Sequence, residues 1–247
     1  MERIYCGPPP QPHDLYASWN FDPVLLLVLL LAGLLIQHRR QRFTPNRRRF
    51  LWAGWWVLVI AFVSPLCALS SALFSARVVH HLLIVLVAAP LFAIAVQRTE
   101  QSRTDERRLP LFGALLLSTA ILWLWHAPPL YDLALAHVGV YWVMQVSLLA
   151  GFFVFWSSVL SSRSIVETSG VIVGSFAQMG LLGAILTFAA SPLYEAHAIA
   201  PFTWGLTPLT DQQLGGLLMW VPAGIPYAAM LALTSRAGWR RLAGSPA

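Results

Sequence analysis

Two adjacent histidines, His80 and His81, interrupt one of the most apolar parts of the chain, in the stretch RVVHHLLIVLVAAPLF. Burying a histidine in an apolar environment is costly unless another group pairs with it, so histidines in membrane-like segments often have a function. An imidazole ring can bind a metal, transfer a proton or act as a polar anchor. Which role applies depends on the other side chains that the fold brings near.

Three further donors, Cys67, His126 and His137, lie at the ends of other apolar stretches. If these ends meet, the three side chains converge with one of the adjacent histidines. Only His80 or His81 can face a given site, because neighbouring residues point about 100° apart on a helix. We assign His81 to the site and His80 to the membrane interface. Imidazole and thiolate donors suit copper, especially cuprous copper, so we predict a copper site formed by His81, His126, Cys67 and His137.

Each of these donors also has a structural interpretation. A histidine at the end of a membrane helix is often solvated or hydrogen bonded. Cys67 could be a small packed side chain, or a disulfide partner of Cys6 in an oxidising compartment. Three methionines lie inside apolar segments, where we expect them to fill the core rather than to bind copper: Met144, Met179 and Met219.

The composition determines the kind of fold that positions these donors. The chain is 57% hydrophobic and only 11% charged, whereas a soluble domain is about 25% charged. Its mean hydropathy is +0.66. Seven apolar segments are long enough, or nearly so, to cross a bilayer core of about 30 Å. We therefore predict an all-α, polytopic transmembrane bundle with spans at residues 23–37, 50–68, 78–96, 109–125, 138–160, 171–190 and 214–233; the first of these is short.

Arginines determine the expected orientation. The loop His38–Arg49 holds six arginines, and further arginines lie in the loop Gln97–Arg108, at Arg163 and in the C-terminal tail. Cytoplasmic loops are rich in positive residues, so we place the N-terminus outside and the C-terminus in the cytoplasm. This divides the chain into an extended outer tail, the bundle and a basic cytoplasmic tail, at residues 1–22, 23–235 and 236–247. All histidines except His38 then lie on the outer side.

Several functional classes are excluded or disfavoured. All 16 basic residues are arginines, so a retinal Schiff base and a lysine nucleophile are both excluded. The arginines flank apolar spans, which favours anionic lipid headgroups over nucleic acid as their partners. We find no nucleophile–base–acid arrangement and no phosphate-binding loop, so we expect no enzymatic activity.

The stretch LTDQQLGGLLMWVP at the start of the last span has clear local features. Thr210 with Gln213 fits a capping box, and Asp211 is favourable in a first helical turn. Gly215 and Gly216, like Gly170 and Gly174 in the preceding span, allow close approach of a neighbouring helix. Arg77 at the outer surface either pairs with a carboxylate or is solvated; the candidate partners are Asp132, Glu195 and Asp211.

Several stretches, taken in order, resemble the CtaG-type cytochrome c oxidase assembly factors, a family of polytopic membrane proteins. FSARVVHHLLIVLVAAPLF resembles the family's histidine-containing segment, with His81 at its histidine position. WLWHAPPLYDLALAH resembles a segment that here contains Trp125, His126, Pro128, Tyr131 and Asp132. GFFVFW, SPLYEAH and LTDQQLGGLLMW resemble later segments. The resemblance covers roughly residues 50 to 235. It depends most on DQQLGGLLMW, which begins with Asp211 and Gln212.

The resemblance implies a role in maturing a haem–copper oxidase, with copper reaching the catalytic subunit at the outer face of a bacterial cytoplasmic membrane. The expected partners are that subunit, a copper chaperone and the lipid bilayer. This chain departs from the family pattern at Arg77, Tyr141 and Gln145, where members often carry histidines. Outside the metal set, the candidate functional residues are His80, Arg77, Tyr131, Asp132, Asp211 and Gln212.

Three other functions remain open on the sequence. A metal-free scaffold for the oxidase subunit would need the small-residue helix faces but not the histidines. A haem-binding protein would need two axial histidines facing each other across the bundle. A small-solute or ion transporter would be expected to carry carboxylates within its spans, which this chain lacks.

Overall fold

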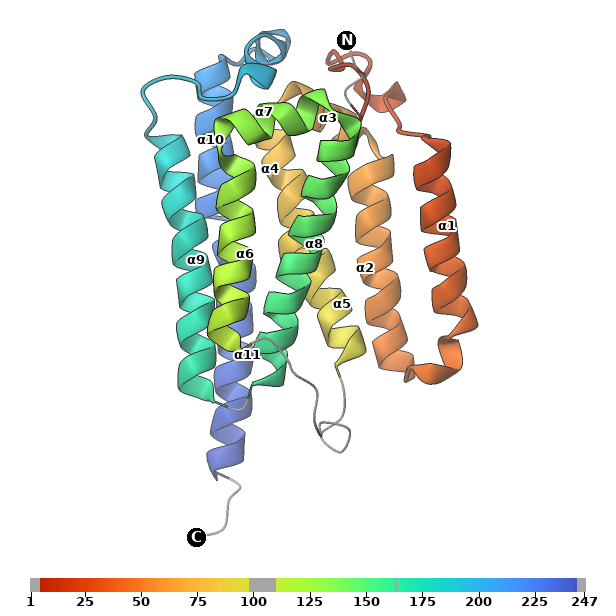
Figure 1. Cartoon of the computed structure of the whole chain (residues 1–247), viewed down its shortest axis with the longest axis vertical. Helices are drawn as coiled ribbons and strands as arrows, with labels where there is room; N and C mark the ends of the chain where they lie inside the picture. Colours follow the sequence, from red (N-terminus) through yellow and green to blue (C-terminus); the bar gives the residue numbers. More distant parts are fainter. Residues whose placement is uncertain (1–4, 98–109, 163, 244–247) are drawn as a thin grey trace.

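The computed structural model describes residues 5–97, 110–162 and 164–243, and all regular structure in these ranges is helical (Figure 1). The arginine loop at residues 98–108 and Arg163 lie outside the described residues. The α-helices are α1 (Pro23–His38), α2 (Pro45–Val63), α3 (Pro65–Ala72), α4 (Phe74–Leu82), α5 (Ala89–Val96), α6 (Leu111–His126), α7 (Pro128–Ala136), α8 (Val138–Ser161), α9 (Ile165–Thr187), α10 (Pro208–Trp220) and α11 (Gly224–Ala243).

Short helical turns complete the chain. The 3-10 turns are η1 (Leu15–Ala17), η2 (Arg40–Arg42), η5 (Glu195–His197) and η6 (Ala200–Trp204), and the π-helical turn η3 spans Leu83–Ala88. Helices α4, η3 and α5 form one continuous apolar helix, Phe74–Val96. A π turn leaves a backbone carbonyl without its usual partner. Here the indole Nε1 of Trp156 donates to the carbonyl of Val85 over 2.9 Å, which stabilises the turn.

The helices account for a multi-pass membrane protein. Four are long and apolar enough to cross a bilayer, at Phe74–Val96, Val138–Ser161, Ile165–Thr187 and Pro208–Arg236. The pairs α2–α3 and α6–α7 raise this to six if each bent pair is one span. Helix α1 is a shorter apolar helix of 16 residues. The seven predicted segments are largely helical where the structure describes them, so the all-α fold is confirmed. By length and apolar character, four to six candidate spans are present among these residues, rather than the seven predicted.

The bends lie at prolines. Helix α3 turns away from α2 by 51° at Pro65, and α7 turns away from α6 by 73° near Pro128. Proline cannot continue a helix but suits its first turn, so each bend ends one helix and begins the next. Helix α7 consequently lies across the end of the bundle rather than along it (Figure 1).

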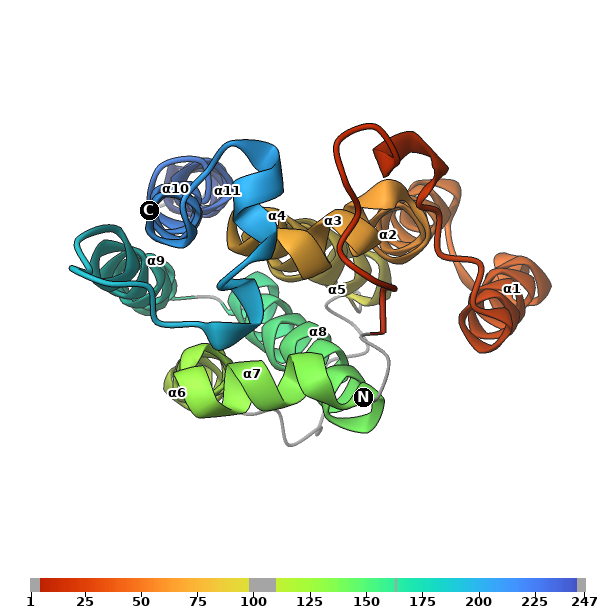
Figure 2. The same cartoon turned by 90° about the horizontal axis from the view of Figure 1, so that it is seen from above.

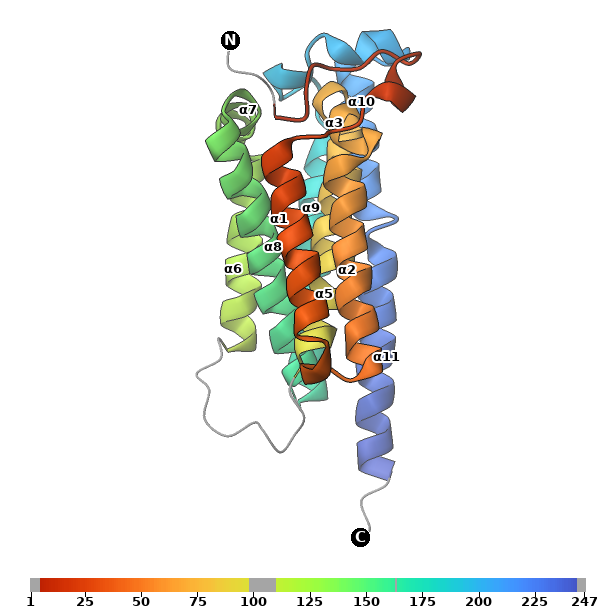
Figure 3. The ribbon, with the colours of Figure 1, turned by 90° about the vertical axis from the view of Figure 1, so that its right-hand side faces the viewer.

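The bundle has two chemically different ends (Figures 1 and 3). The histidine end is formed by α3, α7, η5, η6 and residues 5–22. The arginine end carries η2, the start of α2 and the last turns of α11. Arginines gather at the arginine end, at positions 39, 40, 42, 47, 48, 49, 236 and 240. This segregation is what the charge pattern predicted.

Helix α8 lies near the centre of the bundle, beside α4, α5 and α6, whereas α1 lies at its edge (Figure 2). Helix α8 buries Met144, Leu148, Phe152 and Phe155 almost completely. Helix α1 instead leaves most of its leucines exposed, and a hydrogen bond of 2.9 Å from Trp55 Nε1 to the Leu29 carbonyl ties it to α2. Its exposed face suits contact with lipid.

The start of α10 differs from the predicted capping box. The helix begins at Pro208, one turn earlier than expected, and the hydroxyl of Thr207 accepts a 3.1 Å hydrogen bond from the Thr210 amide. Thr207 is therefore the N-cap, and the assignment of that role to Thr210 was wrong. A proline at the first helical position explains the earlier start.

The glycine predictions hold only in part. A Cβ at Gly216 would lie 2.5 Å from the carbonyl oxygen of Gly183 in α9, and one at Gly215 would meet the Phe74 ring. These two glycines allow α10 to approach its neighbours closely. Gly174 faces Leu115, but a Cβ at Gly170 would have no neighbour within 4 Å. Gly170 is therefore not at a helix contact within this chain.

The replacement Gly216→Ala tests the close contact of α9 with α10. We expect it to lower the stability of the purified protein by about 1–3 kcal/mol, because the new methyl group meets backbone atoms that cannot move aside. Thermal unfolding in detergent measures the change. The matched control is Gly170→Ala, for which we expect no loss because the methyl group enters open space. Equal unfolding temperatures for the two variants would contradict the assignment.

Candidate functional site

A carboxylate from α10 determines where α4 begins. Asp211 is completely buried and accepts hydrogen bonds from the amide of Phe74 over 2.6 Å and from the amide of Ser75 over 3.1 Å. It also accepts one from the Ser75 hydroxyl. Such charge-assisted bonds satisfy amides that a helix N-terminus leaves free, where a negative charge is also favourable. Asp211 thus caps a neighbouring helix, and this role explains why a carboxylate is needed there.

The early start of α4 places its polar residues deeper than we predicted. His80 is completely buried, and its ring packs edge-on against Phe62 with centroids 4.9 Å apart. Neither ring nitrogen has a hydrogen-bond partner among the described residues. The prediction that His80 lies at the interface is therefore wrong. The helix runs almost two turns from Phe74 before it reaches His80, about 9 Å at 1.5 Å per residue.

Arg77 is also buried, with 1% of its surface exposed. Its Nε donates to the Ser70 carbonyl over 3.1 Å, and its guanidinium group lies 5.3 Å from the centre of the Tyr141 ring. Neither terminal nitrogen has a hydrogen-bond partner in the described part of the chain. The expected carboxylate pairing and the solvated alternative were therefore both wrong. A cation–π contact and one backbone carbonyl stabilise the charge instead.

His81 and His126 do come together. Their ring centroids are 6.5 Å apart, although the residues lie on different helices, α4 and α6. The Nδ1 of His126 lies 2.7 Å from the Leu122 carbonyl, which can only accept, so this nitrogen carries the proton. The other nitrogen, Nε2, therefore keeps its lone pair. The Nε2 of His81 lies 3.3 Å from the side-chain amide of Gln145.

The two rings share a small cavity of about 10 Å³ between five helices, roughly the room that one water molecule needs. Apart from the two histidines it is lined by aliphatic and thioether side chains. These are Val78, Leu82, Val85, Leu122, Leu148, Met179 and Met219. The arrangement can hold one small ligand in contact with two imidazoles, away from water.

The other two predicted ligands are elsewhere. Cys67 forms a disulfide with Cys6, so it offers no thiolate to a metal, and the disulfide alternative is the one that the structure contains. This bond fastens residues 5–22 to α3. His137 is exposed at the junction of α7 and α8 and does not line the cavity. Among the described residues, no group of three or more histidine, cysteine or acidic side chains could hold a metal.

The remaining candidate residues, Tyr131, Asp132 and Gln212, hold the loop between α9 and α10. Asp132 accepts hydrogen bonds from the amides of Glu195 and Ala196, over 3.2 and 3.1 Å. Gln212 accepts one from the Leu193 amide over 2.7 Å. These three residues thus hold the loop at residues 188–207, called the lid below, at the histidine end; they do not line the small cavity.

His197 anchors this lid. It is 2% exposed, its Nε2 accepts a 2.7 Å hydrogen bond from the Tyr131 hydroxyl, and its Nδ1 lies 3.3 Å from the Ala72 carbonyl. Tyr194 also donates to the His126 carbonyl over 3.0 Å. The lid therefore contacts the same turn of α6 that carries the site histidine.

Sequence reasoning also missed Gln145, Met179 and Met219 as neighbours of the site. The methionines looked like core residues, and nothing in their spacing relative to the histidines indicated a shared cavity. A signal for Gln145 did exist, because it is a polar residue in the middle of a strongly apolar span.

A second, larger cavity of about 540 Å³ lies between α1, α2 and α8. Its lining is almost entirely apolar, including Leu25, Leu29, Leu58 and Trp142, and Gln145 is one of its few polar members. Gln145 therefore lines the large cavity and also lies 3.3 Å from the ring of His81.

The lid should loosen in acid because of His197. Its pKa is lowered from 6.5 to about 3, chiefly because burial disfavours the charged ring and also because Arg77 is positive. Between these two values the opened lid binds more protons than the closed one, so stability present above pH 6.5 is lost as the pH falls. From pH 7.5 to 5.0 we expect the closed lid to lose about 2 kcal/mol, a roughly 30-fold rise in opening.

Hydrogen exchange of the amides of residues 193–197, corrected for the intrinsic rate at each pH, measures this opening. The variant His197→Gln should lose most of the pH dependence, whereas His13→Gln, which changes an exposed histidine, should keep it. If His197→Gln kept the full dependence, another group would be responsible.

Comparison with known proteins identifies the family of the chain. The family described as cytochrome c oxidase caa3 assembly factor matches residues 28–241, which include every helix of the bundle at least in part. Neither a curated protein nor a solved structure matches the chain. Since the match covers most of the chain, the protein belongs to the cytochrome c oxidase caa3 assembly factor family.

Proposed function

We propose that the protein helps to mature a haem–copper oxidase by carrying copper to its catalytic subunit within the membrane, without catalysing a reaction itself. Membership of the oxidase assembly factor family supports a role in oxidase assembly. The observation that carries the copper role is the pair His81 and His126, whose rings lie 6.5 Å apart beside one cavity. Imidazole is a common ligand for copper.

The surroundings of the pair suit a transient ligand. Metal–imidazole nitrogen distances are about 2 Å, so two imidazoles on one ion have ring centres roughly 5–6 Å apart. The observed 6.5 Å is close to this spacing, and a small movement of either helix would complete it.

The charge pattern supports an orientation. Arginines at one end of the bundle favour the cytoplasm there, which supports the proposal that the histidine end faces outward from a bacterial cytoplasmic membrane. The disulfide between Cys6 and Cys67 lies at that end, consistent with an oxidising outer compartment. Copper delivered by an outer chaperone would then enter on the side where the histidines lie.

The haem alternative fits poorly, because a cavity of about 10 Å³ beside the two histidines cannot contain a porphyrin. A metal-free scaffold is the second candidate. This alternative is favoured by the large apolar cavity beside α1. It is also favoured because the described residues contain no cluster of three or more histidine, cysteine or acidic side chains that could hold a metal. A scaffold would bind the oxidase subunit through apolar surfaces and would not need either histidine.

A strain that lacks the protein tests the proposal. We expect its membranes to contain the oxidase polypeptide with most of its copper and activity missing. Reintroducing the wild type should restore both, whereas His81→Ala and His126→Ala should not. The control is His13→Ala, which changes an exposed histidine in the N-terminal segment and should restore the oxidase fully.

The readouts are the copper content and activity of the purified oxidase, with immunoblots to show that each variant reaches the membrane. Full restoration by the His81→Ala and His126→Ala variants would overturn the copper role and favour the scaffold. An oxidase with normal copper and activity in the deletion strain would overturn the assembly role.

A further inference from the structure

We infer that Met179 and Met219 complete the ligand set, so that His81, His126 and the two thioethers form one His₂Met₂ site for a cuprous ion. This inference rests on the proposed function and identifies the chemical form of its cargo. The four side chains come from four helices, α4, α6, α9 and α10, and line the same small cavity. The remaining lining residues are aliphatic and offer no donor.

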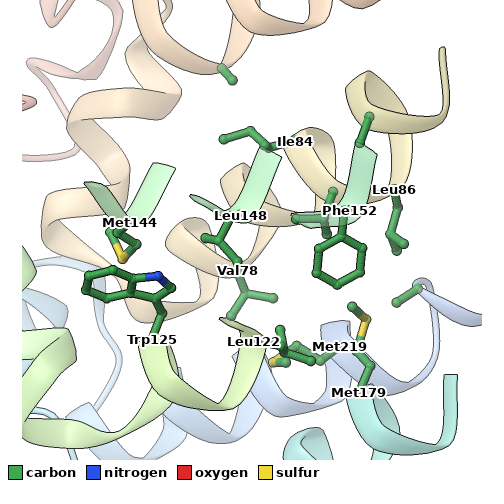
Figure 4. Packing of buried hydrophobic residues seen from close by; sticks show 14 of the residues in the cluster. Val78, Ile84, Leu86, Leu122, Trp125, Met144, Leu148, Phe152, Met179 and Met219 are labelled. Carbon is green, nitrogen blue, oxygen red and sulfur yellow. The ribbon is translucent and has the colours of Figure 1, made fainter. Parts of the chain in front are cut away.

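Both methionines are buried, with 1% and 2% of their surfaces exposed. They lie together near Leu122, at one side of the buried cluster, while Met144 lies apart from them (Figure 4). Methionine often fills irregular gaps in a core, and that role accounts for Met144. It does not account for an unfilled space bordered by two thioethers and two imidazoles.

The charges of the surroundings select the oxidation state. Imidazole and thioether are neutral donors, and no carboxylate lines the cavity. The cost of removing an ion from water rises with the square of its charge, so a divalent ion costs about four times as much as a monovalent one. The buried guanidinium group of Arg77, one turn before His81, disfavours a doubly charged ion further.

The donor chemistry leads to the same conclusion. Thioethers and thiolates select cuprous copper, whereas carboxylates and water suit harder ions. A site made of two imidazoles and two thioethers therefore favours Cu(I) over Zn²⁺ and over Cu²⁺. Because none of the four donors must lose a proton to bind, loading also requires no proton release into the apolar core.

Neighbouring groups hold the rings in place. The Nδ1–H of His126 donates to the Leu122 carbonyl, which leaves Nε2 free for a metal and is typical of metal-binding histidines. The amide oxygen of Gln145 is buried without a partner. If the amide turns this oxygen toward His81, it accepts the proton of Nε2 and leaves Nδ1 of that ring as the donor. Gln145 is in this view a positioning residue.

The experiment titrates the purified full-length protein with Cu(I) under anaerobic conditions, against the chelator bathocuproine disulfonate. We expect the wild type to bind one Cu(I) per chain. Its X-ray absorption spectrum should show sulfur scattering at a copper–sulfur distance of about 2.3 Å. The double variant Met179→Leu/Met219→Leu keeps volume and apolar character. It should bind at least tenfold more weakly and lose the sulfur signal.

The matched control is Met144→Leu, which changes a fully buried methionine that does not line the cavity. It should bind Cu(I) as the wild type does. Thermal unfolding of all three proteins shows whether the substitutions preserve the fold. The inference is overturned if the wild type binds no Cu(I), if the double variant keeps wild-type affinity or sulfur scattering, or if Met144→Leu weakens binding equally.

The copper content of the oxidase in the deletion strain distinguishes a failure of the proposed copper site from a failure of the proposed assembly role. If the double variant binds no Cu(I) but still restores the oxidase fully, the methionines do not serve delivery and the assembly role stands. If the deletion strain assembles a copper-replete oxidase, the proposed function fails whatever the titration shows.

Discussion

The buried carboxylate of Asp211 determines the geometry of everything around the histidines. By accepting hydrogen bonds from the first amides of α4, it fixes where that helix starts. It also joins α10, which carries Met219, to the helix that carries His81. The glycine at 215 allows the Phe74 ring to lie directly against α10. A shift of α4 by one residue would rotate His81 by about 100° away from the cavity. Asp211 therefore affects the candidate site by fixing the position of α4 relative to α10.

The histidine end is built to keep this site dry. Helix α7 turns across the bundle at Pro128 (Figure 1), and the lid is hydrogen bonded to α7 through Asp132 and Tyr131. Tyr194 connects the lid to the backbone of His126. Neutral donors beneath such a cover bind a monovalent ion at lower cost than a divalent one. In the copper role that we propose, the same lid would open for loading or release, and we expect His197 to make its stability sensitive to pH.

The sequence was sufficient for the fold class and for the pairing of His81 with His126. Apolar length predicted the helices, and the charge pattern predicted which loops share an end. The sequence did not predict how deeply His80 and Arg77 are buried, or which side chains lie beside the two site histidines. His80 and Arg77 are buried because Asp211 starts α4 one turn before the predicted span, which is a tertiary effect. The roles that we propose for Met179 and Gln145 depend on which faces of separate helices meet, and no local sequence pattern records this.

The central claim is that His81 and His126 bind a single ion together. Copper stoichiometry in the single variants His81→Ala and His126→Ala and in their double variant tests it most directly, in competition with a Cu(I) chelator. The account predicts one Cu(I) in the wild type, a large loss of affinity in each single variant and at least as large a loss in the double variant, because each substitution removes a donor from one site. If either single variant kept one ion at wild-type affinity, the two histidines would not bind the same ion and the account would be contradicted.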